Sequence, residues 1–423
     1  MDAAADLRSF VLVTTLTVNN GSKADGGASA SPFVAPLGLA VGERLNRLFV
    51  SDHGSHQIYT VDLLSNRVHV LAGGRRAGSA DGKGDLATFH KPAGLCLDSH
   101  GDLLVCDSGN HKIRKVTLHA VVTSVAGGSS KGFLPGLADV AQFSAPYDIC
   151  LARNGSILVS DSDNHRIRVW NSDSNFISTY AGEGKNGYQE NPRKNCLLDY
   201  PLGMAVDENG VLFVADNHNN CIRVIQPNES TATTTLAKIR GVCCLAYHYG
   251  NLYATSISGS QVYQVLHRHR LALRLLAGTG SQDFADGRGH LAAFKYPCGI
   301  CCYQNSLFVA DWGNRKIRRL LLPADCLSPP LVIPQADRHL TAPASKSTRI
   351  DGHSHDREPI SQITAPQSSE QSSSAIPAAA AVRVGLSESS QPTVDPNSVD
   401  HSCQTGHCRH PASQSGTNRS PPN

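Results

Sequence analysis

Histidine and cysteine are the residues of this 423-residue chain whose chemistry is most versatile, and the chain holds 19 of the first and 13 of the second. Both side chains bind transition metals, and a cysteine thiolate is also a nucleophile. Their densest cluster is HSCQTGHCRH at 401–410, where zinc or copper could bind His401, Cys403, His407, Cys408 and His410. This segment is rich in Ser and Pro on both sides, so we interpret the cluster as composition. No other metal site and no cofactor is predicted.

Four further histidines, His56, His111, His165 and His218, each follow an aspartate by two to four residues. Each belongs to a separate unit of a repeated sequence, so a shared metal site would require four distant turns to converge. We therefore expect these histidines to form local hydrogen bonds.

The cysteines show no pair of C-x2-C motifs at the spacing of a zinc module. One position of the repeat instead alternates between two small residues: Ala40, Cys96, Cys150, Ala205, Ala246 and Cys301. This alternation predicts a tight core position for a small apolar side chain. Reduced, buried thiols are typical of a cytoplasmic protein, which is the predicted localisation.

The repeat itself is the strongest signal in the chain, because one phrase recurs six times. Clear copies are VCDSGNHKIRKV from Val105, VSDSDNHRIRVW from Val159 and VADWGNRKIRRL from Val309. The marker position of the phrase falls at Asp52, Asp107, Asp161, Asp216, Ser256 and Asp311, with successive spacings of 55, 54, 55, 40 and 55 residues.

Each unit contains four short β segments separated by turn residues, with no helical period. In the second unit these segments are 94–98, 103–107, 113–116 and 120–128. Repeated four-stranded units without helices predict the blades of a β-propeller. The sixth unit stops after its third strand, and the apolar segment 10–18 at the N-terminus can supply the missing fourth. The prediction is an all-β, six-bladed propeller of four-stranded blades, closed by the N-terminal strand.

Composition divides the chain near residue 324. We predict that residues 8–323 form the propeller and that residues 324–423, rich in Ser, Pro and His, form a disordered tail. The tail has seven basic and nine acidic residues, so the first 323 residues carry a net charge of +5. Such a mild excess does not indicate a nucleic-acid-binding arm, and no apolar run reaches the ~20 residues of a membrane helix. We expect a monomer with no membrane contact.

The phrase D-x-x-N-H-x-I-R-x-[VI], preceded by G-x-[LF]-x-V-[AS]-D, resembles the NHL repeat over about three-quarters of the chain. This resemblance implies a six-bladed propeller. It is less informative about function, because the family includes RNA-binding and substrate-binding propellers of ubiquitin ligases, lyase-type enzymes and interaction modules. The RING and B-box zinc modules of the ligases have no counterpart in this sequence.

Two further recurring features concern how the blades pack. A long loop places an apolar residue, usually Phe, three residues before a proline, as in Phe89/Pro92 and Phe294/Pro297, and we expect it to fill the gap between blades. An Arg also recurs, and the marker Asp is its candidate partner. The recurring Arg residues are Arg114, Arg168, Arg223 and Arg318, with Tyr59 and Tyr263 in the other two units.

Departures from the repeat are the candidate binding sites. The fifth unit lacks the marker Asp, the Asn-His pair and the preceding loop, which predicts a notch beside Tyr247, Tyr249, Tyr253 and Tyr263; plain decay of the repeat is the alternative explanation. The turn after the second strand carries an expected exposed Trp312 with basic neighbours, a composition suited to protein or single-stranded RNA. The candidate partner-binding residues are Trp312, Arg315, Lys316, Arg166, Lys112, Tyr249 and Tyr263.

No G-x-S-x-G, H-E-x-x-H or P-loop motif is present, so no catalytic residue is assigned. The leading hypothesis is a non-enzymatic scaffold that binds a protein partner. An RNA-binding propeller is the second hypothesis. A metal-dependent lyase or hydrolase, with ligands converging on the central channel, is the third.

Overall fold

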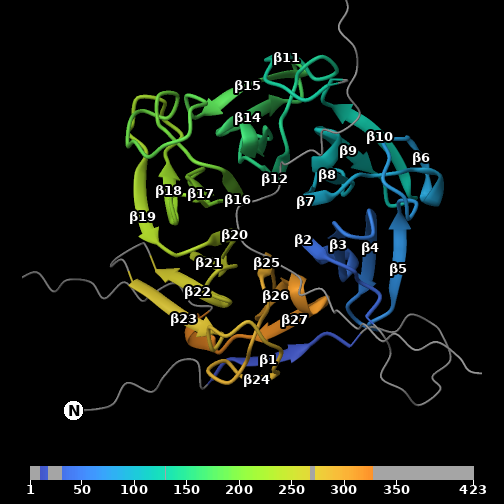
Figure 1. Cartoon of the computed structure of the whole chain (residues 1–423), viewed down its shortest axis with the longest axis vertical. Coiled ribbons are helices and arrows are strands. Elements are labelled where there is room, and N and C mark those ends of the chain that lie inside the picture. Colours follow the sequence, from blue (N-terminus) through green and yellow to red (C-terminus); the bar gives the residue numbers. More distant parts are fainter. Residues whose placement is uncertain (1–9, 18–30, 129, 267–271, 327–423) are drawn as a thin grey trace, which may run out of the picture. The chain divides into compact units, whose positions relative to one another are not determined.

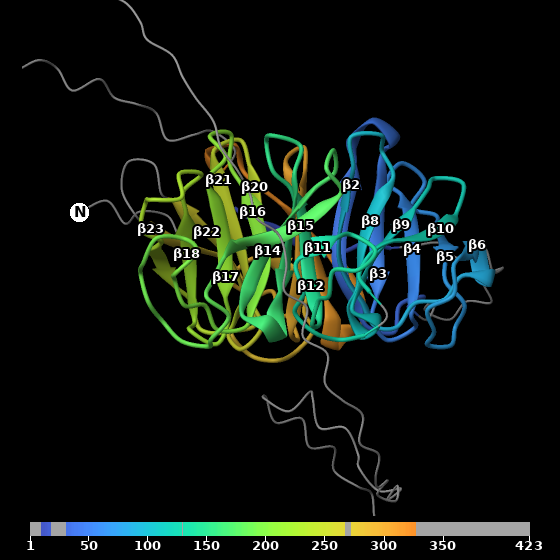
Figure 2. The same ribbon diagram turned by 90° about the horizontal axis from the view of Figure 1, so that it is seen from above.

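The computed structural model describes residues 10–17, 31–128, 130–266 and 272–326, whose strands form six antiparallel sheets arranged in a ring (Figure 1). In the side view the strands run between two opposite faces of the ring (Figure 2). The predicted six-bladed propeller is therefore confirmed. Residues 327–423, on which the predicted tail and the His/Cys cluster fall, lie outside the described residues.

The first three blades follow one another along the chain, each with its innermost strand first. Blade one consists of β2 (Pro36–Gly42), β3 (Arg47–Asp52), β4 (Gln57–Asp62) and β5 (Val68–Ala72). Blade two consists of β7 (Pro92–Leu97), β8 (Leu103–Asp107), β9 (Lys112–Val116) and β10 (Val121–Ala126), with the two-residue strand β6 (Gly82–Lys83) outside it. Blade three consists of β12 (Pro146–Leu151), β13 (Ile157–Asp161), β14 (Arg166–Asn171) and β15 (Phe176–Ala181), with β11 (Gly136–Leu137) outside.

The last three blades complete the ring. Blade four consists of β16 (Pro201–Val206), β17 (Leu212–Asp216), β18 (Cys221–Ile225) and β19 (Thr234–Lys238). Blade five consists of β20 (Val242–His248), β21 (Asn251–Ser256), β22 (Gln261–Leu266) and β23 (Ala272–Ala277). Blade six consists of β25 (Pro297–Tyr303), β26 (Ser306–Asp311) and β27 (Lys316–Leu321), and its fourth strand is β1 (Leu12–Thr15), with β24 (Gly287–Arg288) outside.

The N-terminal strand closes the ring as predicted. β1 pairs antiparallel with β27, with Val13 opposite Leu320 and Thr15 opposite Arg318. The side chains of Val11 and Val13 are fully buried. The last blade is thus built from the two ends of the propeller sequence, which joins strands about 300 residues apart in one sheet.

Buried apolar side chains fill the spaces between blades, which explains why the middle strands have no polar face. All five residues of β8 are buried, because both sides of a middle strand pack on neighbouring blades. Phe89, which precedes Pro92 by three residues, is fully buried in a cluster with Phe49 of blade one and Leu103 of blade two. The predicted role of this aromatic in filling the gap is confirmed for Phe89.

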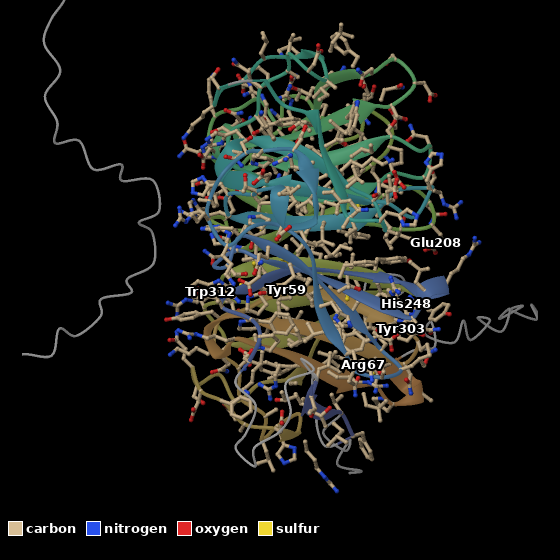
Figure 3. All side chains as sticks on the ribbon, turned by 90° about the vertical axis from the view of Figure 1, so that its right-hand side faces the viewer. Tyr59, Arg67, Glu208, His248, Tyr303 and Trp312 are labelled. Carbon is tan, nitrogen blue, oxygen red and sulfur yellow. The ribbon has the colours of Figure 1, made fainter. Side chains whose placement is uncertain are left out.

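Because successive strands are antiparallel, the connections alternate between the two faces of the ring. The turns from second to third strand and the loops between blades lie on one face, here called the loop face, which carries Trp312 (Figure 3). The turns from first to second and from third to fourth strand lie on the other, the hairpin face, which carries Arg67, Glu208 and His248 (Figure 3).

The described chain continues three residues beyond the predicted end of the propeller. Ala324–Cys326 form a short 3-10 turn, and the carbonyl of Cys326 accepts hydrogen bonds from Tyr253 Oη (2.7 Å) and Gln264 Nε2 (3.2 Å). None of the helices in the described part of the chain has the length and apolar character needed to cross a membrane.

Candidate functional site

The recurring Asp and Arg form a buried ion pair in four blades. In blade two, Arg114 Nη1 donates to Asp107 Oδ2 at 2.7 Å, and both side chains are fully buried. The same pair recurs between Arg168 and Asp161, Arg223 and Asp216, and Arg318 and Asp311, at 3.0, 2.9 and 2.7 Å. The predicted partnership of marker Asp and repeated Arg is confirmed.

Each of these arginines also holds the long loop that precedes its blade. Arg114 donates to the carbonyls of Thr88 (3.0 Å) and Ala80 (2.9 Å), and its guanidinium lies 5.2 Å from the centre of the Phe89 ring. The marker Asp107 accepts the backbone N–H of His90 in that loop at 2.7 Å. The marker Asp also binds the turn after it: Asp107 accepts from Asn110 Nδ2 at 2.8 Å, and in blade one Asp52 accepts the backbone N–H groups of Gly54 and Ser55. The marker Asp and the repeated Arg thus hold the preceding long loop against the blade, and we call this Asp–Arg pair with its loop contacts the clamp.

Three of the four repeated histidines link one blade to the next. The Nδ1 atoms of His56, His111 and His165 accept the backbone N–H groups of Lys91, Ala145 and Tyr200, at 3.1, 3.0 and 3.2 Å. All three histidines have a left-handed backbone, with φ between 51° and 61°. His218 occupies a different place in its turn and lies 3.2 Å from Asp199. Hydrogen bonding is confirmed as their role, although the bonds reach the following blade.

Five of the seven candidate partner-binding residues lie on the loop face, in or directly after the turns that follow the second strands of blades two, three and six. Arg315 is exposed and Lys112 is half-buried, and among the described residues no carboxylate forms an ion pair with either. Arg166 and Lys316 contact aromatic rings, with cation-to-centroid distances of 3.8 Å to Phe133 and 5.0 Å to Phe284. The fifth, Trp312, is half-buried rather than exposed and packs edge-on against Tyr296 with ring centroids 6.0 Å apart.

The tyrosines of blade five do not line one notch. The connection between β19 and β20 is short, as expected, and it lies on the loop face. Tyr247 and Tyr249 lie at the opposite, hairpin face, and Tyr253 is fully buried. Tyr263 is half-buried, with its hydroxyl donating to Gln261 Oε1. The expected grouping of these four residues beside the short connection is therefore wrong.

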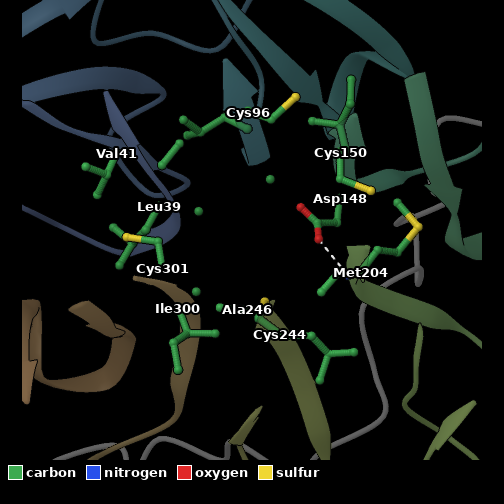
Figure 4. A pocket seen from close by; sticks show the side chains of 18 of the residues that line it. Leu39, Val41, Cys96, Asp148, Cys150, Met204, Cys244, Ala246, Ile300 and Cys301 are labelled. Atoms are coloured by element: carbon green, nitrogen blue, oxygen red, sulfur yellow. Dashed lines mark hydrogen bonds between the residues drawn. The ribbon is translucent and has the colours of Figure 1, made fainter. Parts of the chain in front are cut away.

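A cavity of about 390 Å³ occupies the central channel and opens toward the hairpin face (Figure 4). It is lined by the innermost strands of all six blades. The repeat position that alternates between Ala and Cys lines this cavity in all six blades. The small side chains predicted for a tight core position therefore belong to the channel wall: Ala40, Cys96, Cys150, Ala205, Ala246 and Cys301. Burial raises the pKa of the Cys96, Cys150 and Cys301 thiols, which keeps them protonated.

One carboxylate, Asp148, projects into this cavity. Its Oδ2 accepts the backbone N–H of Met204 at 2.8 Å, and desolvation by burial raises its pKa to about 7. The equivalent residue is glycine in four blades, where the inner strands approach closely: a Cβ on Gly299 would lie 2.0 Å from the Leu37 carbonyl oxygen. In blade five the position is Cys244. The sequence interpretation missed Asp148, although an Asp in place of Gly after Pro-x in the third unit was the available signal.

A small cluster of thiols lies at the wall of the channel cavity, which Cys244 helps to line. Tyr147 Oη is 3.2 Å from Cys243 Sγ, which is 3.7 Å from Cys244 Sγ, and the hydrogen bonds among these groups lower the pKa of the Cys243 thiol. The cysteines of the described residues are all free thiols. Within the described ranges, no group of three or more His, Cys, Asp or Glu side chains is arranged to hold a metal ion.

Six four-stranded blades, an N-terminal closing strand and repeated Asp–Arg clamps define a six-bladed β-propeller. A family model for the NHL repeat matches residues 89–116, 143–170 and 198–225, in blades two to four. The chain therefore contains NHL repeats in these blades, as the sequence resemblance implied.

Known proteins of several kinds are similar in sequence to part of this chain. The chain is 33% identical to human NHL repeat-containing protein 2 over 357 residues, covering 70% of this chain and 48% of that protein. It is 27% identical over 208 residues to SUPPRESSOR OF QUENCHING 1, chloroplastic, from Arabidopsis thaliana, covering 46% and 20%. It is 28% identical over 149 residues to a probable peptidyl-alpha-hydroxyglycine alpha-amidating lyase from Caenorhabditis elegans, covering 35% and 40%. The chain thus spans half the length of these relatives or less.

Among solved structures, a gluconolactonase from Xanthomonas campestris superimposes with a TM-score of 0.52 at 16% identity, covering 76% of this chain and 93% of that one. At this identity the likeness establishes the fold alone.

Proposed function

We propose that this propeller is a non-catalytic protein-binding module whose loop face binds an acidic segment of its partner. The observation that carries the proposal is the placement of Lys112, Arg166, Arg315, Lys316 and Trp312 on that one face, where they are spread over blades two, three and six. Opposite charge steers a partner toward such a face and fixes its orientation.

Two acidic groups of the loop face, Asp163 and Asp199, are engaged with residues other than the five candidates, so they do not compensate the charge of those candidates. Asp163 forms an ion pair with Lys131 at 3.1 Å, and Asp199 lies 3.5 Å from His165 and 3.2 Å from His218. An acidic peptide would supply the missing carboxylates.

RNA is the second candidate, and the same positive face favours it. Single-stranded RNA is bound largely by stacking of bases on aromatic faces. Three exposed rings lie in the long loops, Phe133, Phe284 and Tyr188, but Arg166 or a clamp arginine covers each of them at 3.8 to 4.9 Å from the ring centre. The stacking surface is thus reduced, which supports the protein partner. A metal-dependent lyase would need a ligand set that the described residues do not form.

Affinity capture from a cell extract, with and without nuclease, tests this proposal. Three forms are compared: the wild type, the double variant Lys112→Glu/Arg315→Glu on the loop face, and the double variant Arg67→Glu/Arg153→Glu on the hairpin face as a charge-matched control. We expect partner proteins that survive nuclease, are lost with the double variant and are kept by the control. Loss of every partner on nuclease treatment would instead establish the RNA-binding function.

A further inference from the structure

The channel cavity has the character of a small-molecule site rather than of a packing defect. Its volume of about 390 Å³ falls in the range of ligand pockets, and its wall combines aliphatic side chains, among them Leu39, Leu95, Ile149 and Ile300, with a comparable polar surface. The wall includes no Lys or Arg. The wall carries two carboxylates, Asp148 on the innermost strand of blade three and Glu43 at the outer end of the cavity.

Asp148 lacks a compensating cation. Its Oδ2 is held by the Met204 amide, while Oδ1 lies against Gly94, so close that a Cβ there would be 2.2 Å away. Among the described residues no Lys, Arg or His forms an ion pair with it. A half-buried carboxylate without a cationic partner is costly to ionise, in line with its raised pKa, and a bound cation would offset that cost.

The entrance to the cavity has the same charge preference. A second hollow on the hairpin face is lined by Glu43, Asp207 and Glu208, together with Tyr247, His248 and Tyr249. Four lining residues, Glu43, Val206, Tyr247 and His248, are shared with the channel cavity, so the two spaces adjoin. Carboxylates beside aromatic rings attract organic cations through charge and through cation–π contacts.

We propose that the channel binds a small organic ammonium ion, whose nitrogen pairs with Asp148 and whose apolar body fills the aliphatic chamber. A primary or secondary amine fits better than a metal ion, because one carboxylate cannot satisfy the six or more oxygen ligands of a hard cation. The cavity opens toward the hairpin face, so its entrance is separate from the proposed protein-binding surface on the loop face.

The proposal has a definite pH signature. The ammonium pairs with the ionised carboxylate, and the pKa of Asp148 in the empty protein is about 7. At pH 6 most molecules carry the neutral acid, so binding an ammonium requires loss of that proton. At pH 8 the carboxylate is already ionised. Affinity for an amine should therefore rise between pH 6 and pH 8, while affinity for a neutral molecule of the same shape should not.

Isothermal titration calorimetry of the full chain with benzylamine, and with benzyl alcohol as its neutral counterpart, tests the proposal. We expect benzylamine to bind at least about tenfold more tightly than benzyl alcohol, as a charge-assisted hydrogen bond provides. Asp148→Asn should abolish this preference. Asp173→Asn is the control, because Asp173 lies in an exposed turn of the same blade, on the hairpin face toward which the cavity opens. This variant should retain the preference for benzylamine. Ala40→Leu should weaken both probes by filling the cavity.

Two results would overturn the proposal. One is benzylamine binding no more tightly than benzyl alcohol to the wild type. The other is a preference for benzylamine that survives in folded Asp148→Asn. If that variant does not fold, the pH profile of the wild type decides: a rise for benzylamine alone supports the site, and a flat profile excludes it.

Discussion

Arg318 offers the sharpest test of the clamp that holds the propeller together. Its Nη1 donates to Asp311 Oδ2 (2.7 Å) and to the Ala293 carbonyl (2.8 Å), and its Nη2 donates to Ala285 and Asp286. The side chain is fully buried and lies in blade six, where the N-terminal strand closes the ring. Replacing it with Met keeps most of the apolar stem and removes all of these donors.

We expect Arg318→Met to lower the free energy of unfolding by about 3–5 kcal/mol, the usual cost of leaving the other half of a buried ion pair without its partner. The neighbouring Arg319→Met is a matched control, because Arg319 is exposed and makes one side-chain hydrogen bond, to Ser306 Oγ at 3.0 Å. That change should cost no more than about 0.5 kcal/mol. Urea unfolding followed by tryptophan fluorescence and circular dichroism measures both.

A double-mutant cycle with Asp311→Asn identifies the source of the loss. Since the Asn keeps an oxygen for the Lys295 amide, the double variant should be more stable than the sum of the single losses predicts, by about 1 kcal/mol or more. Equal losses for Arg318→Met and Arg319→Met, or strictly additive losses in the cycle, would refute the clamp.

Three further predictions concern pH, closure and the channel. Burial lowers the pKa of His111, whose neutral Nδ1 accepts the amide of the next blade, so its stabilising contribution is complete above pH 6.5 and is lost as the pH falls below that value. In the wild type the urea midpoint should therefore fall as the pH is lowered below 6.5, and His111→Gln should reduce this fall. His119→Gln, at an exposed histidine, should leave the fall as large as in the wild type. Val13→Ala in the closing strand should cost about 2 kcal/mol in urea unfolding, because its side chain is fully buried; a cost near zero would contradict closure by β1. Gly94→Ala should lower the thermal midpoint, because the added methyl meets Asp148, and Asp148→Gly in the same chain should recover part of the loss.

The fold was predictable because its evidence is repeated six times. Strand positions, ring closure and the Asp–Arg pair follow from phrases that recur at a fixed spacing, and each blade must bury both of its faces. The Asn-Gly hairpins at 154–155 and 209–210 are also where a left-handed backbone is required, with φ of 82° at Gly155 and 81° at Gly210.

The channel site was less predictable, because a repeat hides what happens at a single position. Nothing in one unit shows whether the small residue at Cys96 faces a core or a channel, since both exclude large side chains. Asp148 became visible as a site only when the ring brought five other inner strands around it. The faces were misjudged for a related reason: Tyr249 and the short connection before Val242 are close in sequence but lie at opposite ends of a strand.

Blade five shows that the losses in the repeat are linked, so they are not independent decay. A clamp arginine needs the carbonyls of the preceding long loop, and blade five has no such loop. An arginine at position 263 would therefore be buried without most of its acceptors, and Tyr263 takes its place. The marker carboxylate also accepts amides of the preceding segment, as Asp52 does from Val34 and Ala35 in blade one, where Tyr59 again stands in place of the arginine. Without a long preceding loop, the marker position of blade five needs no carboxylate. Ser256 there donates to the Arg240 carbonyl and accepts the Gly259 amide. Loss of the loop thus accounts for both other changes. It also leaves the exposed Arg240 on a shorter connection of the loop face, so that face differs from blade to blade and can give a bound partner one orientation.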